Sequence, residues 1–209
     1  MKTESPPGPG PSGAARADGA RAILGDTGIR RALMRIAHEI FERNADLEKL
    51  YLVAIPNGGI PLARVLAANL LQIADVEPTV GILDTTLYRD DLSSTSERPM
   101  LRLTEMPSAV DGRIVVLVDD VVKSGRTIRA AMDALMDFGR PKMVQVVGLV
   151  DRGHRELPIK LDYVGKNVPT NPDEQVHLRG NDGDPSSPLE VVVVGADREE
   201  AGAAQGGAS

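Results

Sequence analysis

Two adjacent acidic residues precede a glycine-containing turn in the segment VVLVDDVVKSGRT, residues 115–127. The hydrophobic run before Asp119 and Asp120 predicts a buried strand that delivers both carboxylates to the carboxyl edge of a parallel sheet, where such folds bind ligands. The run SGRT at 124–127 then begins a helix, whose first turn presents free backbone N–H groups suited to a phosphate. Carboxylates suit ribose hydroxyls and hydrated magnesium. The segment therefore predicts a site for a sugar phosphate with vicinal hydroxyls.

Other common motifs for this chemistry do not occur at this segment. GxxxxGK[ST] is missing from the chain, and no GxGxxG follows the buried run before Asp119, which excludes the usual nucleoside triphosphate and dinucleotide loops there. A plain strand–loop–helix capped by Ser124 is the alternative, but the acids, their spacing and the helix start all agree with a binding site. His38-Glu39 begins like a zinc-protease helix motif without the second histidine at position 42. His154 and His177 have no ligand partner nearby in the sequence.

Strands alternate with helices along the chain, which predicts an α/β fold with a mainly parallel central sheet covered on both faces. The expected strands are 51–55, 79–83, 114–118, 143–150 and 190–194, and the expected helices are 29–40, 62–70 and 126–138. Asp26 or Thr27 is expected to cap the first helix. The polar stretches 84–107 and 151–172 read as long loops, and long loops in compact domains tend to be functional.

Composition limits the class of protein. The chain has 209 residues, 42% of them hydrophobic, and a net charge of −6. The absence of cysteine excludes disulfide scaffolds, thiolate zinc sites and cysteine nucleophiles, and it fits a reducing cytoplasm. No signal peptide or membrane-length apolar run is present, and the acidic balance leaves only a local basic patch for nucleic acid. We expect disordered tails at 1–22 and 198–209 around one domain at 23–197.

The segment at 115–127 resembles the phosphoribosyl pyrophosphate (PRPP) signature of type I phosphoribosyltransferases. The resemblance extends over nearly all of residues 29 to 195 and is strongest for the PyrR family, the pyrimidine operon attenuators that are also uracil phosphoribosyltransferases. The matching segments are RIAHEIFERN (35–44), LDTTLYRDDL (83–92), VLVDDVVKSGRT (116–127), ALMDFGRP (134–141) and LVDRGHRELPIKLDYVGKNVPT (149–170). The resemblance implies the type I phosphoribosyltransferase fold, with a small hood over the base at about 151–170.

The resemblance also implies site residues. Asp119 and Asp120 would hold the ribose hydroxyls and, through PRPP or water, Mg²⁺. The implied PRPP-binding residues are Asn57, Gly58, Gly59, Asp119, Asp120, Val121, Val122, Lys123, Ser124, Gly125, Arg126 and Thr127. The implied catalytic residues are Asp119, Asp120, Arg89 and Asp90, the last two in a mobile loop with Tyr88 and Asp91. The implied base-binding hood residues are Asp151, Arg152, Gly153 and His154.

Two positions depart from the family pattern. Gly58 stands where the family's pyrophosphate loop usually carries arginine, and losing that charge-assisted donor would weaken PRPP binding unless backbone N–H groups suffice. Lys123 stands where PyrR relatives often have tyrosine and purine-specific relatives often have aspartate. Lys123 therefore argues weakly against a purine substrate, although it also fits a solvated loop charge.

RNA contacts are the second implied function. In PyrR attenuators a helix-borne threonine, arginine and histidine, with later basic residues, contact messenger RNA. The implied RNA-binding residues here are Arg35, His38, Arg155, Lys160 and Lys166. The threonine position is Met34, and the alternative is that Arg35 and His38 are merely solvated on the outer face of a helix.

The resemblance thus implies a cytoplasmic uracil phosphoribosyltransferase that makes UMP and diphosphate from uracil and PRPP. It implies in addition a regulator that binds pyrimidine-operon leader mRNA when UMP or UTP occupies the nucleotide site. The alternatives are a regulator with little or no catalytic activity and a phosphoribosyltransferase for another base. A homo-oligomer, dimer or higher, is expected, and no membrane partner.

Overall fold

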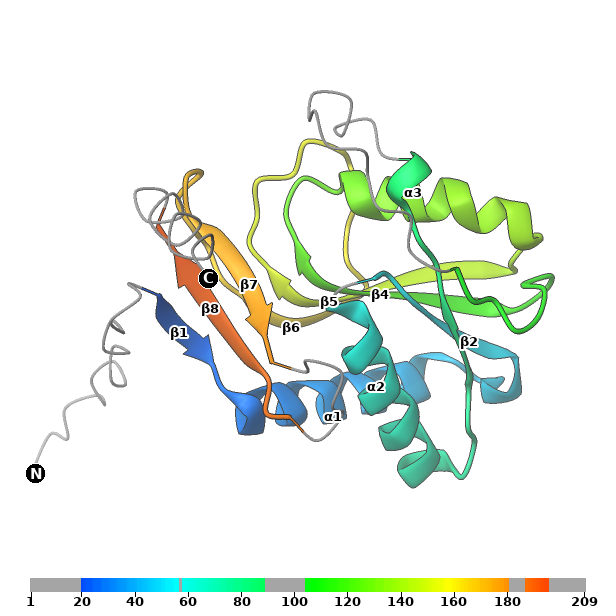
Figure 1. Cartoon of the computed structure of the whole chain (residues 1–209). Coiled ribbons are helices and arrows are strands. Elements are labelled where there is room, and N and C mark those ends of the chain that lie inside the picture. The colour runs from blue at the N-terminus through cyan, green and yellow to red at the C-terminus, as the bar shows by residue number, and fades with distance from the viewer. Residues whose placement is uncertain (1–19, 57, 89–103, 181–186, 196–209) are drawn as a thin grey trace, which may run out of the picture.

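The computed structural model describes residues 20–56, 58–88, 104–180 and 187–195. A five-stranded sheet and a three-stranded sheet form the framework, with α1 and α2 on one side of the larger sheet and α3 on the other (Figure 1). The strands are β1 (Arg21–Leu24), β2 (Leu50–Ala54), β3 (Thr79–Ile82), β4 (Ile114–Val122), β5 (Met143–Asp151), β6 (Tyr163–Asn167), β7 (Gln175–Arg179) and β8 (Glu190–Val194). The helices are α1 (Asp26–Arg43), α2 (Gly59–Ala74) and α3 (Arg126–Leu135), with short 3-10 helices η1 (Leu47–Lys49), η2 (Thr86–Tyr88) and η4 (Met136–Phe138).

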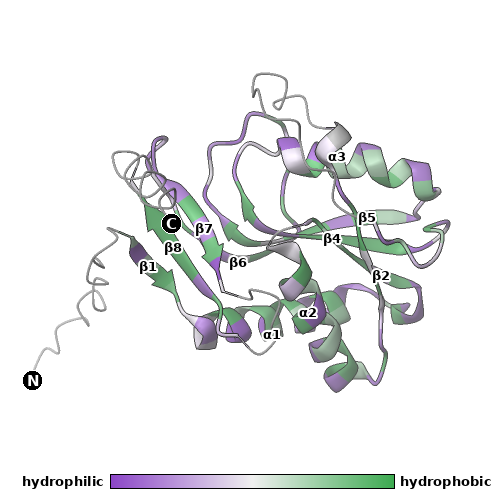
Figure 2. Cartoon of the chain, in the orientation of Figure 1, coloured by the Kyte–Doolittle hydropathy of each residue, from purple (hydrophilic) through white to green (hydrophobic). Residues whose placement is uncertain are grey.

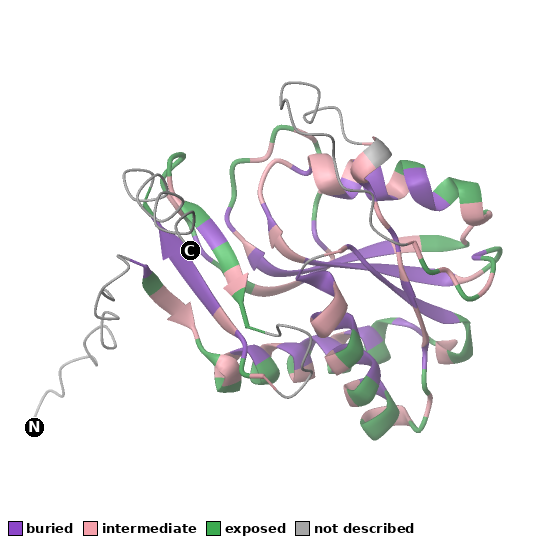
Figure 3. Cartoon of the chain, in the orientation of Figure 1, coloured by how far each residue is buried: buried purple, intermediate pink, exposed green. Residues whose placement is uncertain are grey.

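The larger sheet has the order β3-β2-β4-β5-β6, and every neighbouring pair is parallel. Alternate residues of β4 serve opposite faces, because successive strand side chains point in opposite directions. Val116 and Val118 pack in the core under α1 and α2, whereas Val115 and Leu117 pack under α3. Figure 3 shows these central strands as buried along most of their length. The parallel sheet with both faces covered, expected from the sequence, is confirmed.

After the parallel strands β2 and β4, the chain crosses to opposite faces of the central sheet. β2 is followed by α2 on one face of the sheet, and the adjacent β4 is followed by α3 on the other face. Such a reversal between neighbouring parallel strands leaves a crevice at their carboxyl ends, the usual ligand position in open α/β sheets. The turn before α2 and the acidic end of β4 therefore face each other across this crevice.

β1, β8 and β7 form a small antiparallel sheet. Val176, Val191 and Val193 point from one face of this small sheet into the core shared with α1 and α2. Val192 lies on the opposite face, in a separate cluster with Ala20 and Val194. Figure 2 shows hydrophobic residues along β8 and a mixture of hydropathies along α1, as expected of a helix with one face on the core.

Three strands differ from the sequence prediction. β4 continues through the acidic pair to Val122 because β5 pairs with it to the end, with Val122 opposite Asp151. β6 lies in the stretch 151–172 that we expected to be loop and hood, and it forms the edge of the central sheet, whereas β7 lies where we predicted no element. Both strands carry polar residues at exposed positions, and their pairing partners, which lie elsewhere in the chain, determine their conformation.

The starts of the first strand and of the first helix also differ from the prediction. β1 begins at Arg21, so two residues that we placed in the N-terminal tail pair with β8. Gly25, not Asp26 or Thr27, is the N-cap of α1. The Asp26 carboxylate instead accepts hydrogen bonds from Arg30 Nε at 2.7 Å and from the Leu189 backbone N–H at 3.2 Å. None of the helices in the described ranges is both long and apolar enough to cross a membrane.

A buried polar network joins the end of α1 to the central sheet. Asn44 Nδ2 donates to Ile40 O at 2.9 Å and to Gln145 Oε1 at 3.2 Å, and Gln145 Nε2 donates back to Asn44 Oδ1 at 3.1 Å. Tyr163 Oη donates to the same Gln145 Oε1 at 3.0 Å. Asn44, Gln145 and Tyr163 are all buried. Gln145 is therefore the centre of a satisfied network that fixes α1 against β5 and β6.

Replacing the centre of this network should destabilise the fold more than replacing its edge. Gln145→Leu leaves buried polar atoms of Asn44 and Tyr163 without that partner, and we expect a loss of about 2–3 kcal/mol in the free energy of unfolding. Tyr163→Phe removes one hydroxyl and should cost about 1 kcal/mol. Urea denaturation measures both losses, and equal losses in the two variants would contradict a network centred on Gln145.

Candidate functional site

The acidic pair lies in the last part of β4, at the mouth of the crevice. Asp119 is buried, and its Oδ1 accepts a hydrogen bond from the Asp120 backbone N–H at 3.0 Å. Burial raises the pKa of the Asp120 carboxyl, while backbone hydrogen bonds, contact with Asp119 and the charge of His177 act in the opposite direction. The two carboxylates thus form one partly desolvated group, which suits ribose hydroxyls or a hydrated cation.

The predicted phosphate loop follows directly. Gly125 has a left-handed backbone (φ 91°) and is the N-cap of α3, so a glycine is required where the chain turns into the helix. Ser124 Oγ accepts a hydrogen bond from the Arg126 backbone N–H at 3.3 Å. The remaining backbone donors at the start of α3 give the geometry of an anion site beside the carboxylates.

Not every residue of the predicted PRPP segment can offer its side chain. Val122 is buried in the core under α3, and Val121 packs against the core on the other face of the sheet. The backbones of these two valines are therefore the only parts that can face a ligand. Lys123 is half-buried, and its carbonyl oxygen accepts a hydrogen bond from Arg155.

The turn before α2 approaches the end of β4 at backbone distance. A Cβ added to Gly59 would lie 2.3 Å from the Val118 carbonyl oxygen, and one added to Gly58 would lie 2.2 Å from the Asp120 carboxylate. Contacts below 3.0 Å are essentially never made by real Cβ atoms. Glycine at position 59 is therefore what allows the turn to lie against the backbone of β4, whereas a side chain at position 58 would require the Asp120 side chain to shift. Asn57, the third predicted residue of this loop, lies outside the described residues.

The loop after β5 is fastened to the phosphate loop. Ser124 O accepts hydrogen bonds from the backbone N–H groups of Glu156 at 3.0 Å and Leu157 at 3.1 Å. Arg155 Nη1 donates to Lys123 O at 2.7 Å, and its Nη2 donates to the Asp151 carboxylate at 2.8 Å. The guanidinium of Arg155 thus joins two predicted functional segments.

The predicted base-binding residues occupy the beginning of the same loop, in two different roles. The side chain of Arg152 is buried and donates to Glu174 O at 2.6 Å and Thr170 Oγ1 at 3.1 Å, so it holds the following loop. Gly153 and His154 both have left-handed backbones and are exposed. A non-glycine residue such as His154 in this conformation is uncommon, and such residues cluster at functional sites.

The predicted mobile loop is described only at its start. Tyr88 ends η2, and its hydroxyl donates to the Asp137 carboxylate, which raises the pKa of Tyr88. Arg129 Nη2 on α3 donates to Tyr88 O at 2.9 Å. The loop thus leaves the body of the protein beside α3. Arg89, Asp90 and Asp91 lie outside the described residues.

The predicted RNA-binding residues gather around β6. Arg35 on α1 donates to Val164 O at 2.8 Å and to Gly165 O at 3.0 Å. Lys166 Nζ donates to Ile23 O at 2.9 Å. His38 lies on α1 one turn after Arg35, is exposed, and its Nδ1 is 2.9 Å from Met34 O. Lys160 is exposed.

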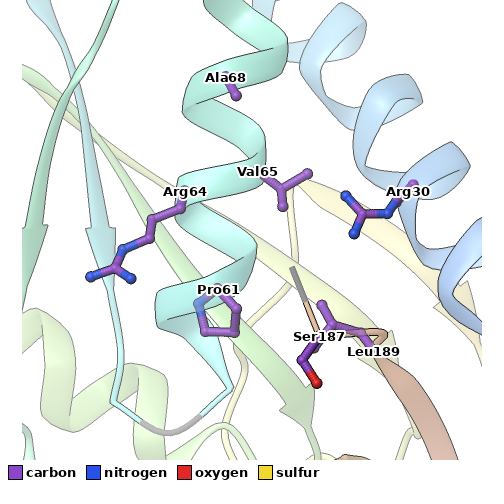
Figure 4. Close-up of a pocket in the computed structure, with 7 residues that line it drawn as sticks. All are labelled: Arg30, Pro61, Arg64, Val65, Ala68, Ser187 and Leu189. Carbon is purple, nitrogen blue, oxygen red and sulfur yellow. The ribbon is translucent and has the colours of Figure 1, made fainter. Parts of the chain in front are cut away.

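Two hollows occur near these elements. One, of about 300 Å³, is lined by Asp151, Gly153, Arg155, Ile159, Lys160, Leu161 and Val164, so it brings base-binding and RNA-binding predictions together. The other, of about 200 Å³, lies between α1, α2 and the chain before β8. Figure 4 shows Arg30 and Val65 facing each other across it, with Ser187 and Leu189 below and Arg64 pointing away. This second hollow contains none of the predicted site residues.

Sequence reasoning did not assign a role to His177. It lies on β7, 57 positions after Asp120, and its charge opposes the rise in the pKa of Asp120 that burial causes. The polar–apolar alternation of QVHLR at 175–179 was the one signal for a strand with His177 on its exposed face.

The donor set fits magnesium bound together with a phosphorylated ligand. Among the described residues there is no group of three or more carboxylate, histidine or cysteine side chains that could enclose a metal ion. Mg²⁺ usually keeps several waters and is held by one or two carboxylates plus substrate phosphates. Asp119 and Asp120, beside an anion site, are such a partial set.

Solved structures with the same arrangement are phosphoribosyltransferases. A hypoxanthine phosphoribosyltransferase from Staphylococcus aureus matches with a TM-score of 0.58 at 19% identity, covering 71% of this chain and 77% of its own. The enzyme of the same name from Trypanosoma cruzi matches with a TM-score of 0.58 at 18% identity, covering 83% and 95%. At these identities the likeness establishes the fold.

Sequence comparison establishes the family. The family model described as a phosphoribosyl transferase domain matches residues 21–178. The "Bifunctional protein PyrR" of Pelotomaculum thermopropionicum is 58% identical over 157 residues, which are 75% of this chain and 87% of that protein. The protein of the same name from Deinococcus radiodurans is 52% identical over 169 residues, 81% of this chain and 92% of that protein. The chain therefore belongs to the type I phosphoribosyltransferases and, within them, to the PyrR family.

Proposed function

We propose that this protein transfers the 5-phosphoribosyl group of PRPP to uracil, giving UMP and diphosphate, and also regulates pyrimidine operon expression. These are the two activities that membership of the PyrR family implies. The observation that carries the enzymatic part is the acidic pair of β4 beside the left-handed Gly125 turn, at the crevice between β2 and β4. Carboxylates and a phosphate site side by side match the ribose hydroxyls and 5-phosphate of PRPP.

The roles of the residues follow from this fit. Asp119 and Asp120 accept hydrogen bonds from the ribose 2- and 3-hydroxyls, and the backbone at 124–127 binds the 5-phosphate. The turn at Gly58 and Gly59 lies against Asp120, where its backbone donors reach the diphosphate. The bond from C1 of the ribose to diphosphate oxygen breaks, a bond from C1 to uracil nitrogen forms, and the nitrogen's proton is released. Catalysis consists of positioning and charge stabilisation, without a covalent enzyme intermediate.

Water has to be kept from the oxocarbenium-like sugar during this step. The loop that continues from Tyr88, with Arg89 and Asp90, is proposed to close over the site, since it leaves the body beside α3, close to the phosphate loop. Magnesium bound with PRPP would neutralise charge on the departing diphosphate. Asp119 and Asp120 would hold that ion through PRPP or water.

The uracil site is proposed to lie at the loop that begins with Asp151. Gly153 N donates to Asp151 Oδ1 at 2.9 Å, so the turn is held from within while its outer backbone groups stay available to a base edge. The Arg152 and His154 side chains contact the loop at Thr170, and hydrogen bonds there support a backbone role for both residues in base binding. Uracil is the proposed base; assay of hypoxanthine, guanine and orotate tests the alternative of another substrate.

The regulatory part is favoured by a separate observation. Arg35 on α1 joins Arg155, Lys160 and Lys166, which lie in or just before β6, so basic residues gather around this strand. On an acidic protein, such a local basic surface suits phosphates and bases of a folded RNA loop. The proposed partner is the pyrimidine-operon leader mRNA, bound when UMP or UTP occupies the crevice. Cytoplasmic location and a homo-oligomeric assembly remain predictions of the family resemblance.

The acidic pair should be indispensable for UMP formation. Asp119→Asn combined with Asp120→Asn keeps the shape of both side chains but removes the charges that hold ribose and magnesium, and we expect UMP formation to fall at least about 100-fold. Radiolabelled uracil with PRPP and Mg²⁺ measures the rate. Asp75→Asn is the matched control, because Asp75 is an exposed, left-handed residue at the end of α2 that asparagine also tolerates. Unchanged turnover in the double variant would refute the assignment.

Lys160 should separate the two functions. Because Lys160 is exposed, Lys160→Gln should weaken the binding of leader RNA while UMP formation stays unchanged. The slope of log binding constant against log salt concentration should become less steep by about the amount expected for one lost phosphate contact. Filter binding with the organism's own leader RNA, with and without UMP, measures the effect. Lys142→Gln is the control, because Lys142 is an exposed lysine just before the amino end of β5. RNA binding that is absent, or independent of nucleotide, in the unmodified protein would overturn the regulatory proposal.

A further inference from the structure

The hollow of about 300 Å³ beside the β5–β6 loop has an apolar floor and charged sides. The apolar part consists of Ile159, Leu161 and Val164, which belong to or pack against the core under α3. Lys160 also lines the hollow and is exposed, and the Asp151 side chain is 21% exposed. A volume of this size lies at the lower end of the range for small-molecule sites. The hollow therefore suits a small group with an apolar face and N–H donors at its edge.

The walls of this hollow are held in place by the protein itself. Arg155 Nε donates to Ile159 O at 3.0 Å, and its Nη2 donates to Asp151 Oδ2 at 2.8 Å, so one guanidinium joins two sides of the hollow. The Glu156 backbone N–H donates to Ser124 O, which fastens the loop beside the start of α3. Figure 1 shows this loop, in yellow, on the side of the sheet that carries α3. A site with walls already fixed loses little conformational entropy when a ligand binds.

The hollow lies apart from the crevice and adjoins the basic residues around β6. None of residues 119–127 is among the described residues that line it, and β5 separates β6 from β4. Val164 lies on β6, the edge strand, and its carbonyl oxygen accepts a hydrogen bond from Arg35 at 2.8 Å. Arg35 comes from α1, on the face of the sheet opposite to α3. An RNA strand crossing the β6 edge would thus meet Arg35 on one side and Lys160, with the hollow, on the other.

We propose that this hollow receives one unpaired base of the leader RNA. The base lies against Ile159 and Val164, its N–H groups face the Asp151 carboxylate, and a flanking phosphate contacts Lys160. The inference rests on the regulatory part of the proposed function and involves neither PRPP nor the acidic pair. It gives the RNA interaction a dependence on base identity, which contacts to phosphates alone do not provide.

Filling the hollow tests the assignment. Val164 is half-buried, so the ring in Val164→Phe should occupy part of the hollow. We expect the Kd for leader RNA, measured by filter binding with UMP, to rise roughly 10-fold, the loss of one stacked base, while the KM for uracil stays within about twofold. Val144→Phe is the matched control, because Val144 is a half-buried valine against the same core that does not line the hollow.

Abasic substitution at each unpaired position of the leader RNA identifies the base. With the unmodified protein, one position should weaken binding roughly 10-fold. With Val164→Phe the same substitution should have no further effect, because the two changes remove the same contact. If the phenylalanine variant melts at a lower temperature than the unmodified protein, Val164→Leu, with its smaller enlargement, repeats the comparison.

Other outcomes overturn the proposal. Unchanged RNA affinity in Val164→Phe would do so, as would an equal loss in Val144→Phe or abasic effects that simply add to that of Val164→Phe. A higher KM for uracil with unchanged RNA binding would assign the hollow to the substrate base instead. If the unmodified protein binds no leader RNA, the regulatory function itself fails, whereas RNA binding that is indifferent to Val164→Phe defeats the role of the hollow alone.

Discussion

The close approach of the turn before α2 to the end of β4 is the constraint on which the site depends. The Val118 carbonyl oxygen accepts the Ile55 backbone N–H at 3.0 Å and lies where a side chain of residue 59 would be. Only a residue without Cβ lets these two backbones meet, since a Cβ there would overlap the carbonyl. As a result the starts of α2 and α3, which lie on opposite faces of the sheet, open towards the same two carboxylates. Two helix N-termini thus converge on one group of acids.

A second constraint comes from the loop after β5. Its backbone and Arg155 hold the carbonyls of residues 123 and 124, so the shape of the phosphate loop is set by residues about thirty positions later in the chain. The same loop carries the proposed base-binding turn and borders the basic surface at β6. The segments proposed to bind phosphate, base and RNA therefore share one hydrogen-bonded unit. This connection is a physical route by which the proposed RNA binding could depend on nucleotide.

The sequence predicted the parts of the site that depend on local chemistry. The buried run before Asp119 and the glycine turn into α3 follow from hydrophobicity and backbone preference, and both stand as predicted. Strands β1, β6 and β7 could not be predicted in the same way, because partners elsewhere in the chain hold them in place. The side-chain direction of Val122 and the buried role of Arg152 also depend on packing that a motif does not contain.

The basic residues show that a sequence motif also cannot reveal the structural contacts of a residue to which it assigns a function. A family motif assigns Arg35, Arg155 and Lys166 to RNA from their positions alone, yet each donates to backbone carbonyls of another segment. A guanidinium has five N–H donors, so Arg35, which donates to the backbone of β6 through Nη2, can hold the fold and still present donors outward. Arg155 already donates from all three of its nitrogens to other segments. A lysine has three donors on one atom, and the contact of Lys166 with Ile23 O occupies one of them. Replacing any of these residues would therefore disturb the fold as well as recognition. Exposed Lys160, which belongs to the same surface, is for that reason the residue through which recognition alone can be examined.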